Sequence, residues 1–228
     1  MSAPSLRARV RSEMVEEIKV VARAHFAREG ANLSLRGVAR DVGIVASALY
    51  RYFPSRDALL TALITDAYED LATAAAAADA AVPREQLRER WMGVCRAVRD
   101  WALAHPAEYG LLYGNPIPGY EAPEETVEPA ARVVLLLVDI VIDGAHRLEP
   151  ISEEIPAAVR SDMRRLIEQR PGAISEARLD RVLAAWTQLF GVISFEVFGR
   201  LDLLIENPDS YFDHQMALMA DMAGLRAL

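Results

Sequence analysis

Apolar residues recur at intervals of three and four along most of this chain, which is the pattern of helices that bury one face. The first predicted helix carries an apolar stripe of Met14, Ile18, Val21, Ala22 and Phe26. Gly30 ends it, because glycine readily takes the backbone conformation that closes a helix. Ser34 offers its hydroxyl as the N-cap of a short second helix, which Gly43 ends.

A third short segment, residues 46–53, follows almost at once. Pro54 closes it, because proline disfavours the helical conformation in the residue before it. Ser55 caps a fourth helix, whose apolar positions 59–71 run into the alanine-rich stretch 72–81. A short helix, a glycine turn and a second short helix packed on a longer one predict a helix-turn-helix.

The remainder of the chain has the pattern of a helical bundle. We expect Pro83 to begin a helix whose apolar stripe is Leu87, Trp91, Val94, Val98 and Trp101. A short helix is predicted over residues 107–114, and residues 114–126, with three prolines and two glycines, are predicted to form a long loop. Further helices are predicted over residues 124–147, 156–169, 176–205 and 208–225, with a turn at residues 170–172.

Charge is distributed unevenly along the chain. Residues 1–57 contain ten Lys and Arg against six acidic residues, a formal charge of +4, although the whole chain carries -8. A basic end on an acidic body is expected where one end approaches phosphates. We therefore predict a DNA-binding domain over residues 1–57. The pocket and dimer features described below predict a helical ligand-binding and dimerisation domain over residues 58–228.

Composition narrows the class of protein further. Apolar residues make up 52% of the chain, with Ala and Leu prominent and β-branched runs scarce, which favours an all-α fold. Cys95 is the one cysteine, so an intramolecular disulfide or a thiolate metal cluster is not expected. The longest apolar run, residues 133–138, is far short of the ~20 residues that span a bilayer. We expect a soluble, cytoplasmic protein without membrane contact.

An enzyme is the main alternative among function classes. A di-iron bundle needs two Glu-x-x-His motifs, and this chain offers only Asp143 and His146 at that spacing. A glycine-rich phosphate loop, a nucleophile elbow and a zinc-ligand cluster are also missing from the sequence. We therefore expect neither a cofactor nor a metal. A DNA-binding protein without a ligand is a second alternative, which the large aromatic body disfavours.

The string SLRGVARDVGIVASALYRYFPSRDALL, residues 34–60, resembles the signature of the TetR family of transcriptional regulators. The resemblance to the DNA-binding head spans about residues 13–68, and the segments HPAEYGLLYG and AAWTQLFGVISFEVFGRL resemble the bodies of some members. It implies an N-terminal three-helix helix-turn-helix domain and a C-terminal helical bundle. The implied protein is a homodimeric repressor that binds double-stranded operator DNA and is released by a small-molecule effector.

The resemblance also implies which residues of the head bind DNA. They are Ser34, Arg36, Val45, Ala46, Ser47, Ala48, Tyr50, Tyr52 and Arg56. The third helix would lie in the major groove, and the two tyrosine hydroxyls would bind phosphates. Val45 and Ala46 leave few polar groups for base edges, so we expect thymine-methyl contacts and DNA deformability to contribute to specificity. The arginines at positions 7, 9 and 11 fit either a minor-groove arm or an ordinary charged tail.

Bulky aromatic and soft side chains on the bundle helices suggest an apolar pocket with a few polar groups. The candidate ligand-binding residues are Trp91, Met92, Cys95, Trp101, His105, Tyr109, Tyr113, Trp186, Gln188, Phe190 and Phe195. The same pattern also fits a plain core, and a lone cysteine in an apolar stripe is usually an inert hydrophobe. The last two helices carry broad apolar faces, which suggest an isologous dimer built as a four-helix bundle.

Overall fold

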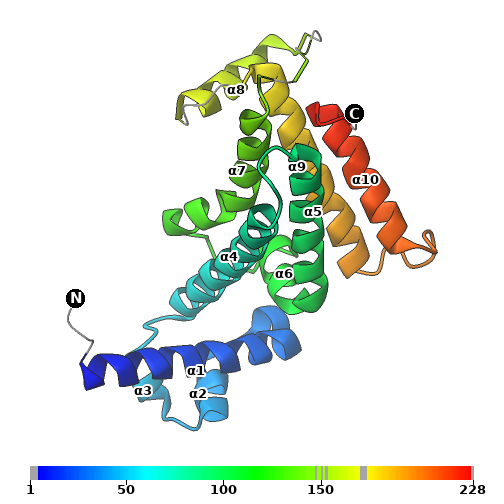
Figure 1. Cartoon of the computed structure of the whole chain (residues 1–228). Helices are drawn as coiled ribbons and strands as arrows, with labels where there is room; N and C mark the ends of the chain where they lie inside the picture. Colours follow the sequence, from blue (N-terminus) through cyan, green and yellow to red (C-terminus); the bar gives the residue numbers. More distant parts are fainter. Residues whose placement is uncertain (1–4, 147, 150, 152–153, 170–173, 227–228) are drawn as a thin grey trace. The chain divides into compact units, whose positions relative to one another are not determined.

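The computed structural model describes residues 5–146, 148–149, 151, 154–169 and 174–226 (Figure 1). Within these ranges the secondary structure is helical and contains no strand, which confirms the predicted all-α fold. The chain divides into two compact units. Unit 1 comprises residues 1–69 and 105–129, and unit 2 comprises residues 70–104 and 130–228.

Unit 1 contains the predicted helix-turn-helix. Its elements are α1 (Leu6–Glu29), η1 (Gly30–Asn32), α2 (Leu35–Val42), α3 (Ala46–Leu49), the first part of α4 (Arg56–Ala80), α6 (Pro106–Tyr113) and η2 (Glu124–Thr126). Ser34 Oγ accepts a hydrogen bond from the backbone N–H of Gly37 at 3.1 Å, as an N-cap does. Gly43 ends α2 at φ 84°, a left-handed conformation that favours glycine. The α helix of the third segment is shorter than the predicted 46–53, because residues 50–52 continue as turns.

One apolar core holds α1 to α4 together within unit 1. Its buried residues are Ile18, Ala22, Leu33, Leu35, Val38, Ala39, Leu49, Phe53, Leu59, Leu60 and Leu63. Leu111 of α6 and the loop residues Ile117 and Tyr120 pack against the same core. The Tyr120 hydroxyl lies 3.0 Å from Thr61 Oγ1 of α4. Residues that follow α4 in sequence therefore complete the core of the helix-turn-helix.

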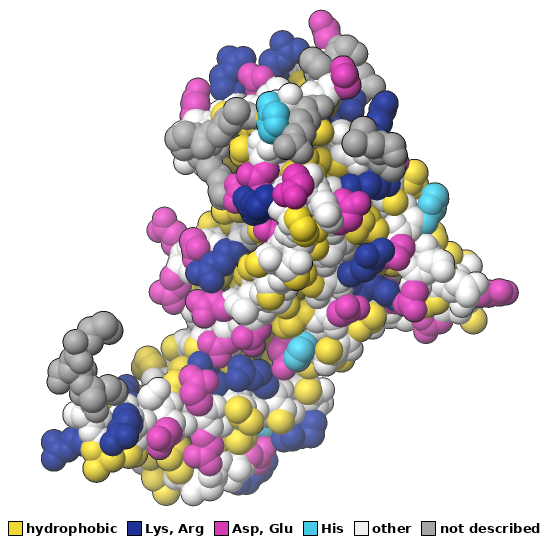
Figure 2. All heavy atoms as spheres, viewed as in Figure 1, with side chains coloured by type: hydrophobic (Ala, Val, Ile, Leu, Met, Phe, Trp, Pro, Cys, Tyr) yellow, Lys and Arg dark blue, Asp and Glu magenta, His cyan; other side chains and the backbone are white. Residues whose placement is uncertain are grey.

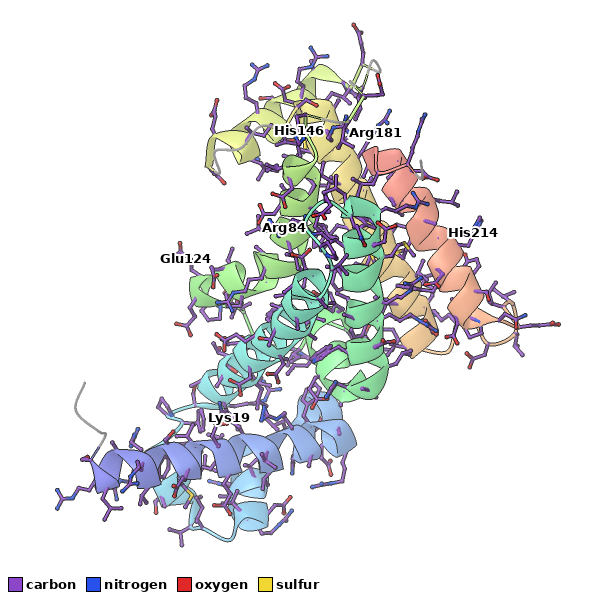
Figure 3. The ribbon with its side chains drawn as sticks, in the orientation of Figure 1. Lys19, Arg84, Glu124, His146, Arg181 and His214 are labelled. Carbon is purple, nitrogen blue, oxygen red and sulfur yellow. The ribbon has the colours of Figure 1, made fainter. Side chains whose placement is uncertain are left out.

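Two cations of α1 bind one carboxylate of α4 in unit 1. Lys19 projects from α1 toward α4 (Figure 3), and its Nζ lies 2.8 Å from Asp66 Oδ2. Arg23 reaches the same carboxylate at 3.2 Å. Burial opposes the charged form of Lys19, but hydrogen bonds to Asp66 and Glu16 outweigh it and raise the pKa of the ammonium. These pairs hold α1 in a defined register on α4.

α2 packs on α1 where Gly37 faces His25. The His25 ring is buried, and its Nδ1 lies 3.2 Å from Asp41 Oδ2 of α2. This hydrogen bond, aided by Arg40, lowers the pKa of the Asp41 carboxyl below its usual value, although desolvation opposes the shift. A methyl group at Gly37 would lie 2.7 Å from Cε1 of His25. The close approach of the two helices therefore requires glycine at this position.

Unit 2 is a helical bundle built from the rest of α4 and five further helices. They are α5 (Leu87–Ala104), α7 (Val127–Asp143), which begins in unit 1, α8 (Ala157–Gln169), α9 (Glu176–Val197) and α10 (Pro208–Ala223). Among the described residues, no helix is long and apolar enough to cross a bilayer. The prediction that the C-terminal part of the chain forms a helical bundle is confirmed.

Three of the predicted helices have wrong boundaries. Pro83 opens a turn closed by the N–H of Gln86, so α5 begins only at Leu87. The helix predicted over 124–147 starts with the 3₁₀ turn η2 and ends at Asp143, after which residues 144–146 form turns. The helix predicted over 176–205 ends at Val197, because Gly199 takes a left-handed φ of 67°. The turn predicted at 170–172 lies outside the described residues.

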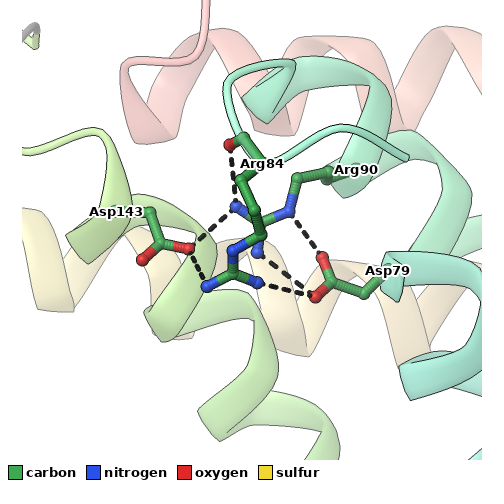
Figure 4. A network of polar contacts seen from close by, with 4 residues as sticks. All are labelled: Asp79, Arg84, Arg90 and Asp143. Atoms are coloured by element: carbon green, nitrogen blue, oxygen red, sulfur yellow. Dashed lines mark hydrogen bonds and ion pairs between the residues drawn. The ribbon is translucent and has the colours of Figure 1, made fainter. Parts of the chain in front are cut away.

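A buried network joins three helices of unit 2 (Figure 4). Arg90 of α5 is fully buried, and its Nε lies 2.7 Å from Asp79 Oδ1 of α4. Its Nη1 lies 2.8 Å from Asp143 Oδ2 of α7, which also binds the more exposed Arg84 at 2.6 Å. Burial opposes the charge on Arg90, yet hydrogen bonds to Asp79 and Asp143 outweigh it and raise the pKa of the guanidinium. The ends of α4 and α7 are thereby fastened to α5.

α10 lies antiparallel to α5, and a ladder of ion pairs joins them. Its rungs are Arg88 with Asp221, Arg96 with Asp213, and Arg99 with Asp209. The Arg96 pair is bidentate, with N–O distances of 2.8 and 2.9 Å, and it lowers the pKa of the Asp213 carboxyl. Arg99 also binds Glu196 of α9 at 2.6 Å. The ladder fixes the register of α10 in the bundle.

We expect Gly37→Ala to destabilise the protein by about 1–3 kcal/mol, because the added methyl overpacks a buried, hydrogen-bonded ring. Gly110→Ala in α6 is the matched control, since a methyl there would meet no atom within 4 Å. The measurement is the free energy of unfolding in urea. Equal stability of the two variants would mean that α2 and α1 do not pack as described.

The Arg96–Asp213 pair predicts a pH-dependent contribution to stability. Because the folded pKa of Asp213 is lowered, its stabilisation is present above the unfolded pKa and is lost as the pH falls through the folded pKa. Since both side chains are about half exposed, we expect Asp213→Asn to cost under about 1 kcal/mol at neutral pH. The difference from wild type should vanish on acidification from about pH 5 to about pH 2.

Thermal melts of both proteins over that range make the measurement, with the exposed Asp70→Asn of α4 as the control. A constant difference between Asp213→Asn and wild type at every pH would contradict the assignment.

Candidate functional site

The outer side of α3 is open to solvent. Val45, at the N-cap of α3, is 69% exposed, and Tyr50, just after its end, is 46% exposed. Ser47 is exposed between them, whereas Leu49 is fully buried in the core of unit 1. α3 therefore has one face that anchors it and another that is free to meet a ligand.

The predicted base-facing residues divide by exposure. Ala46 and Ala48 are half-buried and alternate along the chain with the exposed Val45 and Ser47. Small apolar side chains at this surface offer methyl groups and leave backbone close to an approaching partner. The arrangement suits apolar contact with thymine methyls better than bidentate hydrogen bonding to purines.

The N-terminus of α2 carries two further predicted DNA-binding residues. Ser34 and Arg36 are both exposed there, and the first backbone N–H groups of a helix attract anions. Arg56, from the first turn of α4, is half-buried and donates from Nε to the carbonyl oxygen of Leu33 at 3.1 Å. This hydrogen bond ties the start of α4 to the residue that precedes the N-cap of α2.

Tyr52 is half-buried against the core of unit 1, unlike the exposed Tyr50. The guanidinium of Arg11 lies 5.2 Å from the centre of its ring, and Arg11 Nη2 donates to the carbonyl oxygen of Arg51 at 3.4 Å. Tyr52 is thus partly a core aromatic and partly a surface group. The helix-turn-helix brings all nine predicted DNA-binding residues into unit 1.

Sequence reasoning did not identify the residues that hold α2 in place. His25, Asp41 and Gly37 form that contact, and Asp66 joins α1 to α4. The sequence does indicate that His25 is buried, because His25 continues the apolar stripe of the first helix and is therefore directed inward. Gly37 also interrupts a short helix without ending it.

The predicted ligand-binding residues are divided between the two units. His105, Tyr109 and Tyr113 lie in unit 1, and the other eight lie in unit 2. Tyr109 is fully buried, and its ring centre is 5.0 Å from that of Tyr113, which also meets Tyr68 of α4 edge-on at 6.1 Å. Burial raises the pKa of Tyr113, and the neighbouring tyrosines add to the shift. His105 is exposed at the N-cap of α6.

In unit 2, α5 supplies the most buried candidates. Trp91 and Cys95 are fully buried, Trp101 is nearly so, and Met92 is half-buried. Burial raises the pKa of the Cys95 thiol far above its usual range, so the thiolate that oxidants attack is suppressed. Trp91 Nε1 is buried and has no hydrogen-bond acceptor among the residues that the structure describes.

α9 supplies the remaining candidates. The rings of Trp186 and Phe190 meet edge-on, 6.0 Å apart, and Gln188 Nε2 lies 3.5 Å from Gln215 Oε1 of α10. Phe195 is exposed near the end of α9. Some candidates of unit 2 are therefore packed core, and others lie at the surface of the bundle.

A groove of about 360 Å³ lies between the second half of α4 and α7 in unit 2. Its lining consists of Ala72, Thr73, Ala76, Arg132, Leu135, Leu136 and Asp139. Small side chains on α4 leave the space, and the leucines of α7 form an apolar wall. None of the predicted ligand-binding residues lines this groove.

Known protein families and relatives match both the helix-turn-helix and the bundle of this chain. The family described as bacterial regulatory proteins, tetR family, matches residues 18–63, and the tetracyclin repressor-like C-terminal domain matches residues 91–219. HTH-type transcriptional regulators from Mycobacterium tuberculosis and Mycobacterium bovis are 36% identical to the chain over 193 residues, which cover 83% of the chain and 82% of each relative.

Solved structures show the same likeness. The regulatory protein SCO4313 has a TM-score of 0.78 and 31% identity, over 96% of this chain and 100% of that one. A protein from Rhodococcus sp. RHA1 has a TM-score of 0.66 and 23% identity over 92% of each chain, which shows the fold alone. Family models and relatives thus agree with the helix-turn-helix and the bundle, and the chain belongs to the TetR family of DNA-binding transcriptional regulators, which are not enzymes.

Proposed function

We propose that this regulator is a repressor that occupies operator DNA as a homodimer and is released by a small apolar or aromatic ligand. The observation that carries the proposal is a single helix, α4, that runs from the helix-turn-helix of unit 1 into the bundle of unit 2. DNA binding belongs to residues 1–57 and ligand binding and dimerisation to residues 58–228 in this proposal. A chain of this kind has a DNA-binding surface and a separate body able to receive a signal.

In the DNA complex, α3 enters the major groove. Val45, Ala46 and Ala48 face thymine methyls, and the hydroxyl of Ser47 bonds to a base edge. Tyr50, Tyr52 and the N-terminus of α2 with Ser34 and Arg36 bind phosphates. Arg56 orients α2 through the Leu33 carbonyl and adds positive charge beside the backbone. Few polar groups read bases, so DNA deformability contributes to the choice of operator.

The dimer forms through α9 and α10. Phe190, Phe212 and Met216 are buried within one chain, so they belong to its own core. Phe195, Phe198 and Leu218 remain exposed on the same two helices, together with Leu203, which is 99% exposed in the segment between them. Large apolar side chains left exposed on these neighbouring segments are the residues that a partner would cover. An isologous pairing of α9 and α10 would cover it.

The ligand acts through α4. Asp66 holds the first part of α4 to α1, and Asp79 holds its last turn to Arg90, so each unit grips the helix through charge pairs. A ligand that fits better when α4 is tilted shifts the population of states by its differential affinity. A coupling of about 1–3 kcal/mol weakens DNA binding about 5- to 150-fold.

A regulator that binds DNA without any ligand is the second candidate. Full burial of Trp91, Cys95 and Tyr109 favours it, because these side chains already fill the space that a ligand would need. The orphan Nε1 of Trp91 favours the ligand-responsive candidate, because a buried donor without an acceptor costs about 1–3 kcal/mol until a partner supplies one.

Tryptophan fluorescence separates the two candidates, because Trp91, Trp101 and Trp186 all lie in unit 2. We expect an aromatic compound that quenches this fluorescence to weaken binding to DNA from upstream of the regulator's own gene. By reciprocity, saturating DNA must weaken the fluorescence titration by the same factor. If every compound that binds has the same affinity for the protein with and without DNA, the regulator that acts without a ligand is the correct candidate.

We expect Tyr50→Phe to weaken DNA binding about 2- to 10-fold per head, the value of one hydrogen bond of about 0.5–1.5 kcal/mol. The loss should be equal for operator and arbitrary DNA, since a hydroxyl on phosphate carries no base information. Fluorescence anisotropy with both duplexes makes the measurement. A change in sequence preference at unchanged general affinity would instead place Tyr50 at a base edge.

A further inference from the structure

The arginines that precede the first acidic residue lie in a helix and not in an extended segment. α1 begins at Leu6, with Ser5 as its N-cap, whose Oγ accepts from the N–H of Ala8 at 3.3 Å. Arg7, Arg9 and Arg11 therefore lie on the first two turns of a helix. An extended arm that threads a minor groove is not the form that these residues take.

Two of these arginines continue the face of α1 that packs on the core. Arg7 and Arg11 precede Met14 and Ile18 at the spacings of one helical stripe, and Ile18 is fully buried in unit 1. Arg9 lies two residues from each, about 200° around the helix, on the opposite side. The arginine side of α1 therefore extends past the edge of the core.

That edge is where the α3–α4 turn lies. Arg11 donates to the Arg51 carbonyl at 3.4 Å and stacks over the ring of Tyr52 at 5.2 Å. Figure 1 shows α3 beside the N-terminal half of α1, and both belong to unit 1. The exposed Tyr50 and Arg51 lie on this turn. The end of α1 is thus adjacent to the surface that carries the proposed phosphate contacts.

The charge at this end of α1 opposes the stability of the helix itself. Its first turn contains no acid, and Glu13 is the first acidic residue of the chain. Cations near a helix N-terminus interact unfavourably with the helix dipole. Figure 2 shows Lys and Arg side chains over this end of the molecule. Positive charge that destabilises its own helix is explained if a polyanion binds there.

We propose that Arg7 and Arg11 bind backbone phosphates of DNA that flank the segment read by α3. α1 then acts as a helical extension of the DNA interface, and its arginines lengthen the contacted stretch of backbone. These residues lie outside positions 18–63, the part that matches the DNA-binding domain of the family, so the match does not assign them this role. The inference requires DNA binding but neither repression nor an effector.

The test measures binding of the full chain to a fluorescein-labelled duplex of arbitrary sequence, by anisotropy over a range of salt concentrations. An arbitrary duplex suffices because phosphate contacts carry no sequence information. We expect Arg11→Gln and Arg7→Gln each to weaken binding and to reduce the slope of log affinity against log salt by about 0.9 per bound head, the value of one lost phosphate contact. The double variant should lose both.

Arg9→Gln is the matched control, because it removes the same charge from the same helix on the other side. We expect its salt slope to remain that of wild type. Equal slopes for Arg9→Gln and Arg11→Gln would overturn the proposal in favour of a general charge effect, and so would unchanged slopes in all variants. All these side chains are exposed, so melting curves should confirm an intact fold in each protein.

Discussion

Carboxylates of α4 bound to cations of α1 and α5 hold this helix in place. In unit 1, Asp66 accepts hydrogen bonds from Lys19 and Arg23 of α1, and in unit 2, Asp79 accepts from the fully buried Arg90. Removing a charge from water costs several kcal/mol per ion, so such pairs contribute little net stability. Losing one partner, however, leaves an uncompensated charge and costs about 3–5 kcal/mol. The pairs therefore exclude other registers of α4, and the packing on both sides of the helix depends on them.

The position of α3 in the helix-turn-helix depends on contacts made by the neighbouring helices. α3 has one buried anchor, Leu49, and short side chains on its outer face, so its placement comes from its neighbours. Gly37 lets α2 approach His25 closely, and Arg56 fixes the residue before the N-cap of α2. In the proposed DNA complex, contacts to phosphates set the register in which the few side chains of α3 meet the bases, and the packing around α3 keeps its backbone in place.

Charge pairs also hold together the helices of the bundle. Its α5–α10 ladder and the Arg90 network fix α4, α5, α7 and α10 by directional charge pairs. The second half of α4 bears small side chains and leaves a groove against α7. A helix with small residues on one side can move there without large repacking, because few atoms interdigitate. Asp79, in the last turn of the same helix, is held by Arg90 of α5.

Local chemistry determined much of this protein directly from its sequence. The all-α class, the N-caps at Ser34 and Ser55 and the stop at Gly43 follow from helical periodicity and backbone preference, which involve near neighbours only. The helix-turn-helix could be predicted for the same reason. Only the tertiary structure decided which aromatic residues are core, such as Trp91 and Tyr109, and which are surface, such as Phe195. It also decided that Tyr120 completes the core around α4 and that Asp41, Asp66 and Asp79 hold cations. Periodicity gives the buried face of a helix but not its partner, because ion pairs and packing join residues distant in sequence, and their geometry exists only once the helices have assembled.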